Sequence, residues 1–538
     1  MKSVRCLLMG SAAGLMAVSA AQAADLPVKA APVEYVKVCS LYGAGFWYVP
    51  GTDTCMKIGA WLRVEATEME GDGGIPLGAA GTQTGAGKFT RTDTSDLGFR
   101  YRALMTFDVR TQTDYGTLRS YMDVGTQGTS TGVWPNAPLS GGNTTTAEGG
   151  LNTQYNNNNV DATRAFIQFA GFTLGRMRSF FDINSVGAYS LSNTRLTGDS
   201  SPTGIWGAGY TAQFGGGISL SVSVEDGGVA SPARSRLTGN LSQAAFGAGA
   251  FGGGQTLDNG GNNFFDPVMG LRIDQSWGYA SVVGAFHNDN GGYYNNAINS
   301  TNAGLANTIV QGHPGDTWGY AMGAGFLLTD FMGLKGDTFG SQFIYGKGAT
   351  SYVTKGTGTW AMRNGSFIGG GSTLDGIYAD GTQIDQSTEW SLAAEYEHFW
   401  TPKLHTGVQG GYVSINYDQT ATNLICAGAP GFGPMNNSLG TSIASTVGQP
   451  LTFTNGWAPG SVCHPSFSWY QVGTRTIWNP HPDLDIGVEV LYTGLNTANR
   501  GATVNTGAAS GAVPAGQYTF ANQGVLSSVI RIQRNFLP

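Results

Sequence analysis

The 538-residue sequence is poor in charged residues and lacks the long apolar runs of helical membrane proteins. Charged residues make up 12% of the chain, about half the usual share of a soluble domain. Beyond the first 23 residues there is no run of about 18 apolar residues, which excludes transmembrane helices. The mean hydropathy is −0.11, so apolar residues have not replaced the missing charge. Aromatic residues reach 11%, which argues against a disordered chain.

Glycine is abundant, with 84 residues in the chain, which is about twice its usual share. These glycines follow no three-residue period, so a collagen-like chain is also excluded. A glycine-rich, aromatic-containing chain of moderate hydropathy is typical of a large all-β protein. It suits a transmembrane β-barrel, whose apolar outer face and polar inner face average out.

The N-terminus has the pattern of an export signal. Lys2 and Arg5 precede an apolar stretch that ends in Ala21-Gln22-Ala23, and these are the three parts of a secretory signal peptide. The expected organisation is a signal peptide over 1–23, an N-terminal periplasmic-side segment over 24–56 and a transmembrane β-barrel over 57–538.

Cysteine is scarce, and one of the five cysteines, Cys6, lies in the expected signal peptide. An even number remains, which in an exported protein suggests disulfide bonds. Pairing of sequence neighbours joins Cys39 to Cys55 and Cys426 to Cys463, one of three possible connectivities.

Sixteen segments alternate between apolar and polar residues with the period of a half-exposed strand. In 97–111, for example, Phe99 and Tyr101 share one face while Arg100 and Arg102 share the other. The predicted strands are 57–68, 97–111, 115–125, 160–170, 172–180, 205–214, 218–226, 267–276, 278–287, 317–329, 338–347, 388–399, 404–417, 466–478, 484–494 and 524–536.

The connections between these segments are alternately long and short. Eight long connections and seven tight turns are the asymmetry of an outer-membrane barrel. We therefore predict an all-β fold, a 16-stranded antiparallel transmembrane β-barrel with long extracellular loops and short periplasmic turns. Aromatic residues beside the short turns are expected to form an interfacial girdle, namely Phe172, Phe214, Trp277, Phe331, Phe399, Trp400, Trp478 and Phe536.

Residues 34–59 read EYVKVCSLYGAGFWYVPGTDTCMKIG. This combination of Glu-Tyr-Val-x-Val-Cys, Tyr-Gly-x-Gly and Pro-Gly-Thr-x-Thr-Cys resembles the N-terminal signature of the porins of alphaproteobacterial outer membranes. Gly175-Arg176 followed by Ser179-Phe180-Phe181-Asp182 resembles the strand that leads into the constriction loop of that family. The resemblance implies a homotrimeric pore in outer-membrane lipid and lipopolysaccharide, with its third long loop folded into the lumen. It implies small hydrophilic solutes and ions as the permeating species.

Arginines gather on the non-apolar faces of the first three strands and the last strand. Each would cost roughly 2–4 kcal/mol against lipid at the midplane, so they are expected to face a wet lumen. Closing the barrel makes the first and last strands neighbours, which predicts one arginine-rich wall. Its expected members are Arg63, Arg100, Arg102, Arg119 and Arg531, with Arg164 extending the set.

The third long connection, 181–204, is expected to place Asp182 and Asp199 opposite the arginines and so to create a charged pore constriction. Two further arginines, Arg176 and Arg178, share parity with the apolar residues Phe172 and Leu174. That conflict requires either a bulge or a position above the lipid boundary.

Enzyme motifs are weak in this sequence. The match to GxGxxG at 247–252 has no following helix, no Gly-x-Ser-x-Gly elbow is present, and the six histidines show no metal-ligand spacing. We expect a passive porin rather than an enzyme, with no cofactor, no metal and no nucleic-acid partner. The alternative is an adhesin or receptor barrel that acts through its long extracellular loops. A barrel enzyme would require catalytic groups on the strand rims, which are not found.

The last predicted strand generates a test. Phe536 lies on its outward face, so Phe536→Asp should lower the yield of membrane-inserted barrel several-fold, because a charge replaces an interfacial aromatic residue. Deletion of Leu537 and Pro538 is the matched control and should change the yield little. Equal losses in both variants, measured as heat-modifiable protein in outer-membrane fractions, would contradict a terminal aromatic signal.

Overall fold

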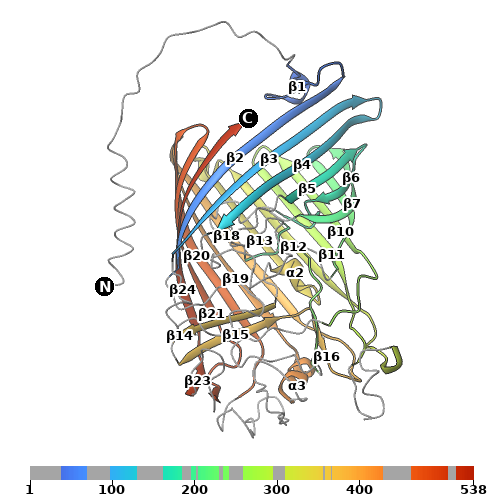
Figure 1. Ribbon diagram of the computed structural model, residues 1–538, viewed down its shortest axis with the longest axis vertical. Helices are drawn as coiled ribbons and strands as arrows, with labels where there is room; N and C mark the ends of the chain where they lie inside the picture. The colour runs from blue at the N-terminus through green and yellow to red at the C-terminus, as the bar shows by residue number, and fades with distance from the viewer. Residues whose placement is uncertain are drawn as a thin grey trace. The chain divides into compact units, whose positions relative to one another are not determined.

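Paired antiparallel strands close into a barrel in the computed structural model (Figure 1). The structure describes residues 38–69, 97–129, 161–183, 196–200, 204–228, 234–241, 258–294, 309–354, 358–364, 366–427, 462–506 and 516–537. Contacts divide the chain after Val38 into two units, and all that follows concerns residues 39–537.

Sixteen strands form the barrel wall within these residues, and each predicted strand overlaps one of them, so the predicted fold class is confirmed. Each strand pairs with the next one along the chain, and the last pairs with the first. The strands are β2 (Thr54–Met69), β3 (Leu97–Thr113), β4 (Gly116–Thr129), β5 (Asp161–Phe169), β6 (Phe172–Met177), β7 (Ile205–Gly215), β8 (Ile218–Glu225), β10 (Asp266–Gln275), β11 (Gly278–Asp289), β12 (Thr317–Thr329), β13 (Thr338–Lys347), β18 (Thr388–Thr401), β19 (Leu404–Asn416), β20 (Phe467–His481), β21 (Leu484–Asn496) and β24 (Gln523–Leu537).

Short turns join these strands at one end of the barrel, and long connections join them at the other. The turn between β5 and β6 consists of Ala170 and Gly171, whose φ angles are +49° and +87°. Two successive residues with positive φ are typical of the type I′ turn that fits the twist of a tight hairpin. The C-terminal end of β24 lies at the short-turn end, and β15 and β23 lie at the opposite end (Figure 1).

The outer face of the wall is apolar and the inner face is polar. On β3, the exposed fraction of Phe99 is 62% and that of its neighbour Arg100 is 3%. Large apolar side chains facing outward are what a lipid environment requires. No helix in the described part of the chain is long and apolar enough to cross a membrane.

Six of the eight residues predicted to form the aromatic girdle have exposed side chains. These are Phe172, Phe214, Trp277, Trp400, Trp478 and Phe536. The two other side chains are half-buried. Phe399 stacks on His405 with ring centroids 4.7 Å apart, next to a register shift between β18 and β19. Phe331 lies in the turn helix η5 (Phe331–Gly333) and stacks on Phe339.

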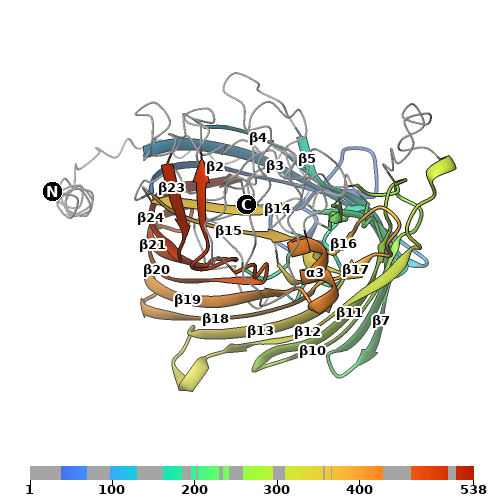
Figure 2. The ribbon, with the colours of Figure 1, turned by 90° about the horizontal axis from the view of Figure 1, so that it is seen from below.

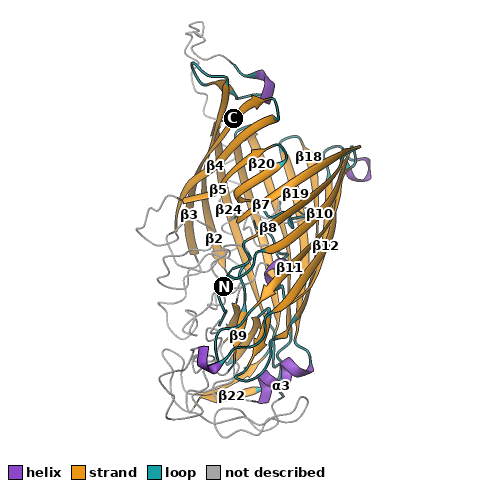
Figure 3. Ribbon diagram, turned by 90° about the vertical axis from the view of Figure 1, so that its right-hand side faces the viewer, coloured by secondary structure: helices purple, strands orange, loops and turns teal. Residues whose placement is uncertain are grey.

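The long connections contribute small elements of their own. A four-stranded sheet and a three-stranded sheet lie across the long-connection end of the barrel (Figure 2), and the helices are short (Figure 3). These elements are β14 (Gly358–Asn364), β15 (Phe367–Thr373), β22 (Thr503–Thr506) and β23 (Gly516–Phe520) in the first sheet, β9 (Thr238–Asn240), β16 (Gly376–Tyr378) and β17 (Asp385–Gln386) in the second, and η4 (Ile309–Gln311), α2 (Thr350–Val353) and α3 (Gln419–Ala427).

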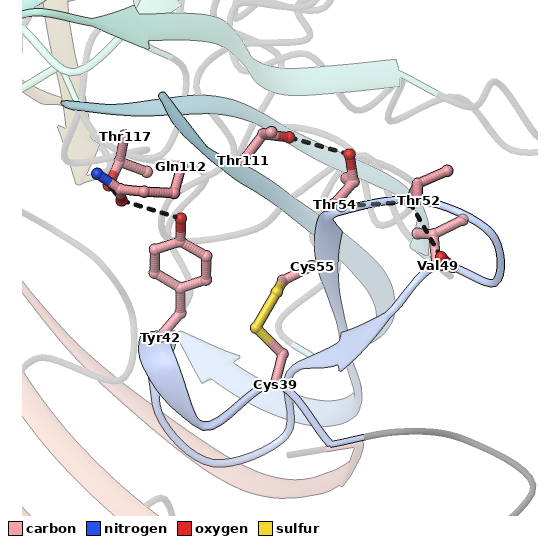
Figure 4. The surroundings of a disulfide bond; sticks show 9 residues. All are labelled: Cys39, Tyr42, Val49, Thr52, Thr54, Cys55, Thr111, Gln112 and Thr117. Carbon is pink, nitrogen blue, oxygen red and sulfur yellow. Dashed lines mark hydrogen bonds between the residues drawn. A yellow bond between two sulfur atoms is a disulfide. The ribbon is translucent and has the colours of Figure 1, made fainter. Parts of the chain in front are cut away.

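A short segment before the barrel is bound to β2 by a disulfide (Figure 4). It contains η1 (Ser40–Tyr42) and β1 (Trp47–Tyr48), which pairs with β2. Phe46 is buried against the Cys39–Cys55 disulfide, and the Arg110 guanidinium lies 4.9 Å from the centre of its ring. Both disulfides of the sequence prediction, Cys39–Cys55 and Cys426–Cys463, are present.

This small core generates a prediction. Replacing Cys39 and Cys55 by Ser should free the segment, since a loop of this length contributes roughly 3 kcal/mol in the chain-entropy account. Limited proteolysis of the folded protein should then cleave within 39–55 about tenfold faster or more. The Cys426→Ser, Cys463→Ser variant is the control, with cleavage within 39–55 unchanged. An unaltered cleavage rate in the first variant would show that packing alone holds the segment.

Candidate functional site

A buried carboxylate organises the arginines at the junction of the first and last strands. Glu65 of β2 pairs in register with Arg100 of β3 and with Arg531 of β24. Its carboxylate accepts from Arg100 Nε at 2.6 Å and from Arg531 Nε at 2.8 Å. Glu65 is fully buried, so these charge-assisted bonds are shielded from water and strong.

Two further arginines in the same place have neutral partners. Arg63 of β2 lies opposite Arg102 of β3. Arg63 Nε donates to Gln533 Oε1 at 2.8 Å, and Arg102 Nε donates to Gln127 Oε1 at 2.7 Å. The charge of this group, four guanidinium groups against the single carboxylate of Glu65, is therefore +4 − 1 = +3. We call Arg63, Arg100, Arg102 and Arg531 the arginine wall.

The other two predicted arginines lie elsewhere on the lumen face. Arg119 donates to Asp108 at 3.0 Å, and Arg110 donates to the same carboxylate. Asp108 follows Arg102 by six positions on β3, or roughly 20 Å along a strand. Arg164 of β5 lies opposite Asp123 of β4. The structure therefore brings four of the six predicted arginines together.

The third long connection leaves the wall early. β6 ends at Met177, so Arg178 no longer belongs to the alternating face, and its parity conflict disappears. The backbone of β6 is distorted at Gly175, whose φ is +124°. A Cβ atom there would lie 2.4 Å from the Ala165 carbonyl oxygen, so only glycine fits.

Glu225 and Asp182 hold the start of this connection. The Glu225 carboxylate accepts from Ser179 Oγ and from the Phe180 backbone N–H, both at 2.7 Å. The Asp182 carboxylate accepts from Arg234 at 2.7 Å and from the Ser200 backbone N–H at 3.1 Å. The Asp182 side chain is fully buried.

The Arg178 guanidinium lies between the two predicted constriction carboxylates. Its distances are 3.4 Å to Asp182 and 3.7 Å to Asp199. Arg178 is about half exposed and Asp199 is nearly buried. Arg164 interacts electrostatically with both aspartates. Asp182 thus serves as an anchor within the connection, whereas Arg178, which is paired with both aspartates, is the exposed member of this group.

The same connection reaches the far side of the barrel interior. Ile183 is buried in a cluster with Val283 of β11 and Ile344 of β13. Leu196 is buried in another cluster that includes Val413 of β19 and Trp469 of β20. Between these clusters, the Gly198 backbone N–H donates to the Val353 carbonyl at 2.9 Å. These contacts place the described parts of the connection inside the barrel.

Sequence reasoning missed the carboxylates of the lumen face. Glu65 shares the polar face of its strand with Arg63, but the sequence alone does not show which arginines it joins. On β18, Glu397 accepts from His405 Nδ1 at 2.6 Å and from Arg475 at 2.7 Å. The available signal was the alternation of Glu395 and Glu397 with outward-facing residues on 388–399.

A closed sixteen-stranded barrel with an apolar exterior, a charged interior and long connections at one end defines the class of outer-membrane β-barrel proteins. Residues 25–527 match the model of the Porin subfamily. The chain belongs to this porin family and is a protein of the bacterial outer membrane.

The chain is similar to curated porins and to a solved channel. It is 31% identical over 233 residues to "Porin Omp2a" of Brucella melitensis, covering 42% of this chain and 57% of that protein. It is 39% identical over 123 residues to "Porin Omp2a" of Brucella abortus, covering 22% of this chain and 33% of that protein. The outer membrane channel DcaP of Acinetobacter baumannii has the same fold, with a TM-score of 0.51, 12% identity and coverage of 91% and 99% of the two chains.

The buried position of Glu65 generates a stability prediction. Glu65→Gln removes the carboxylate from the arginine wall and should destabilise the barrel by about 3–5 kcal/mol, since breaking a buried pair leaves unpaired charge. Asp274→Asn is the matched control, because the Arg272–Asp274 pair is exposed and should contribute under about 1 kcal/mol. Equal shifts of the two denaturant midpoints would show that Glu65 does not stabilise the wall.

Proposed function

We propose that the protein is a water-filled channel for passive diffusion of small hydrophilic solutes and ions. The observation that carries this proposal is the arginine wall on the inner face, with the third long connection crossing the interior. The four guanidinium groups and the Glu65 carboxylate together carry a net charge of +3. Such groups are stable in a barrel when the lumen holds water and counter-ions.

The proposed constriction lies between the arginine wall and the third connection. Asp199, paired with Arg178, is the carboxylate that we assign to the loop side of this constriction. Asp182 supports it indirectly, because its bonds to Arg234 and Ser200 hold the connection in place. The opposed charges would produce a transverse field that sorts permeating ions by sign and size.

The short strand β6 supports a homotrimer, which the family resemblance implies. β6 has only six residues, whereas a transmembrane strand needs about 9–11. Irregular backbone cannot face lipid, so we propose that a neighbouring copy covers this side. Outer-membrane lipid and lipopolysaccharide would surround the remaining outer face.

Ion selectivity tests the channel proposal. In planar bilayers the purified protein should give stepwise conductance. The Arg63→Gln, Arg102→Gln variant should shift the reversal potential toward cations, because these two arginines have neutral partners. Asp199→Asn should shift it toward anions. Both shifts should shrink in 1 M salt, where the Debye length is about 3 Å.

Arg272→Gln is the matched control, since this arginine is partly exposed near a short turn and is already paired with Asp274, so its loss should change selectivity far less. Conductance with unaltered selectivity in the Arg63/Arg102 variant would place the constriction elsewhere. A folded barrel without conductance would favour the adhesin or receptor alternative, in which the small sheets of the long connections form the binding surface.

A further inference from the structure

A buried histidine lies on the inner face of β11, near the long-connection end of the wall. His287 and Asp289 are fully buried and share this face. The neighbouring residue Phe286 points to the outer face and is 58% exposed. The His287 Nδ1 atom lies 2.6 Å from Asp266 Oδ2. The Tyr352 hydroxyl donates to the same oxygen at 2.8 Å. A carboxylate bonded to one ring nitrogen fixes the proton there and leaves the other nitrogen free as a ligand.

The free nitrogen of His287 faces a second carboxylate. Its Nε2 atom lies 3.5 Å from Asp375 Oδ2. Asp375 belongs to the connection between β15 and β16, and it is oriented by bonds from the Thr350 and Leu237 backbone N–H groups at 2.7 and 2.6 Å. The barrel wall and a loop inside the barrel therefore each contribute a potential ligand.

Asp289 completes the cluster. Its Oδ2 atom accepts from Gln386 at 2.6 Å, while its Oδ1 atom is buried and has no hydrogen-bond partner among the described residues. The same holds for His287 Nε2. One donor atom each from His287, Asp289 and Asp375 lie within 4.8 Å of one another. Unpartnered polar atoms in a fully buried place are costly unless something binds them.

The local charge favours a cation. Asp266, Asp289, Asp375 and Glu389 are all buried, and neither carboxylate oxygen of Glu389 has a hydrogen-bond partner in the described chain. Against these four carboxyl groups stands the buried Arg236, which interacts electrostatically with Asp289. A buried carboxyl group without a cationic partner tends to hold a proton. A divalent ion would take the place of such protons, because metal ligands bind in their deprotonated form.

We propose that His287 Nε2, Asp289 and Asp375 bind a divalent transition-metal ion such as Zn²⁺, which fastens the connection between β13 and β18 to the barrel wall. Imidazole and carboxylate ligands at about 2.0–2.2 Å around a tetrahedral centre lie roughly 3.4 Å apart. The observed 3.5 Å between His287 and Asp375 already fits. No metal-ligand spacing is visible in the sequence, because the three ligands come from positions 287, 289 and 375.

Zinc binding to the full-length, chelator-treated protein in detergent tests this site. Isothermal titration with Zn²⁺ should give one ion per chain. Asp289→Asn should weaken binding at least tenfold, and Asp266→Asn should weaken it by about 10–100-fold, as loss of an outer-shell partner does. His405→Gln is the matched control, because His405 also bonds a carboxylate but lies outside the cluster. The zinc affinity of this variant should match that of the wild type.

Thermal unfolding of the wild-type protein gives a second readout that does not depend on any variant. Added Zn²⁺ should raise its Tm and should not raise that of Asp289→Asn or Asp375→Asn, whose folding is checked by heat-modifiable migration. Absence of stoichiometric binding to the wild type would overturn the proposal. Wild-type zinc affinity in both Asp289→Asn and Asp375→Asn would also overturn it. Conductance of the metal-free wild type tests the channel separately, so failure of one proposal does not imply failure of the other.

Discussion

Pairing of β24 with β2 is the constraint on which the rest of the molecule depends. Lipid offers no hydrogen bonds, so every backbone N–H and C=O group of the wall needs a partner strand. The register of this junction places Glu65 between Arg100 and Arg531. The two end strands are thus joined by a buried ionic contact as well as by backbone bonds.

The size of the closed barrel explains the behaviour of the long connections. Side chains of sixteen strands cannot fill the interior by themselves. The connections therefore enter it and bury apolar residues such as Ile183 and Leu196 against opposite walls. Backbone groups carried inside need polar partners, which Glu225 and Asp375 supply. These two carboxylates are accordingly buried where a loop meets the wall.

The sequence was sufficient to predict the wall but not its interior. Lipid on one side and water on the other impose a period of two, so Phe99 and Arg100 could be assigned to opposite faces without a structure. Ion pairs such as Arg100–Glu65 and Arg234–Asp182 depend on register and on loop paths, which leave no periodic signal. The girdle prediction included both Phe399 and Trp400, although adjacent strand residues point to opposite faces. Trp400 is exposed, whereas Phe399 stacks on His405. The four cysteines were easier, since sequence neighbours did pair.

The contact between Glu65 and Arg531 joins residues 466 positions apart, whereas the other wall strands pair with their neighbours along the chain. Its closing contact cannot form until nearly the whole polypeptide has been synthesised and placed, because the entropy of so long a loop must be overcome first. Until that moment β2 and the newest strand are both open edges, which bind other chains in water and are costly in lipid. The topology therefore makes closure of the ring the last step of assembly, and the two edge strands stay exposed until that step.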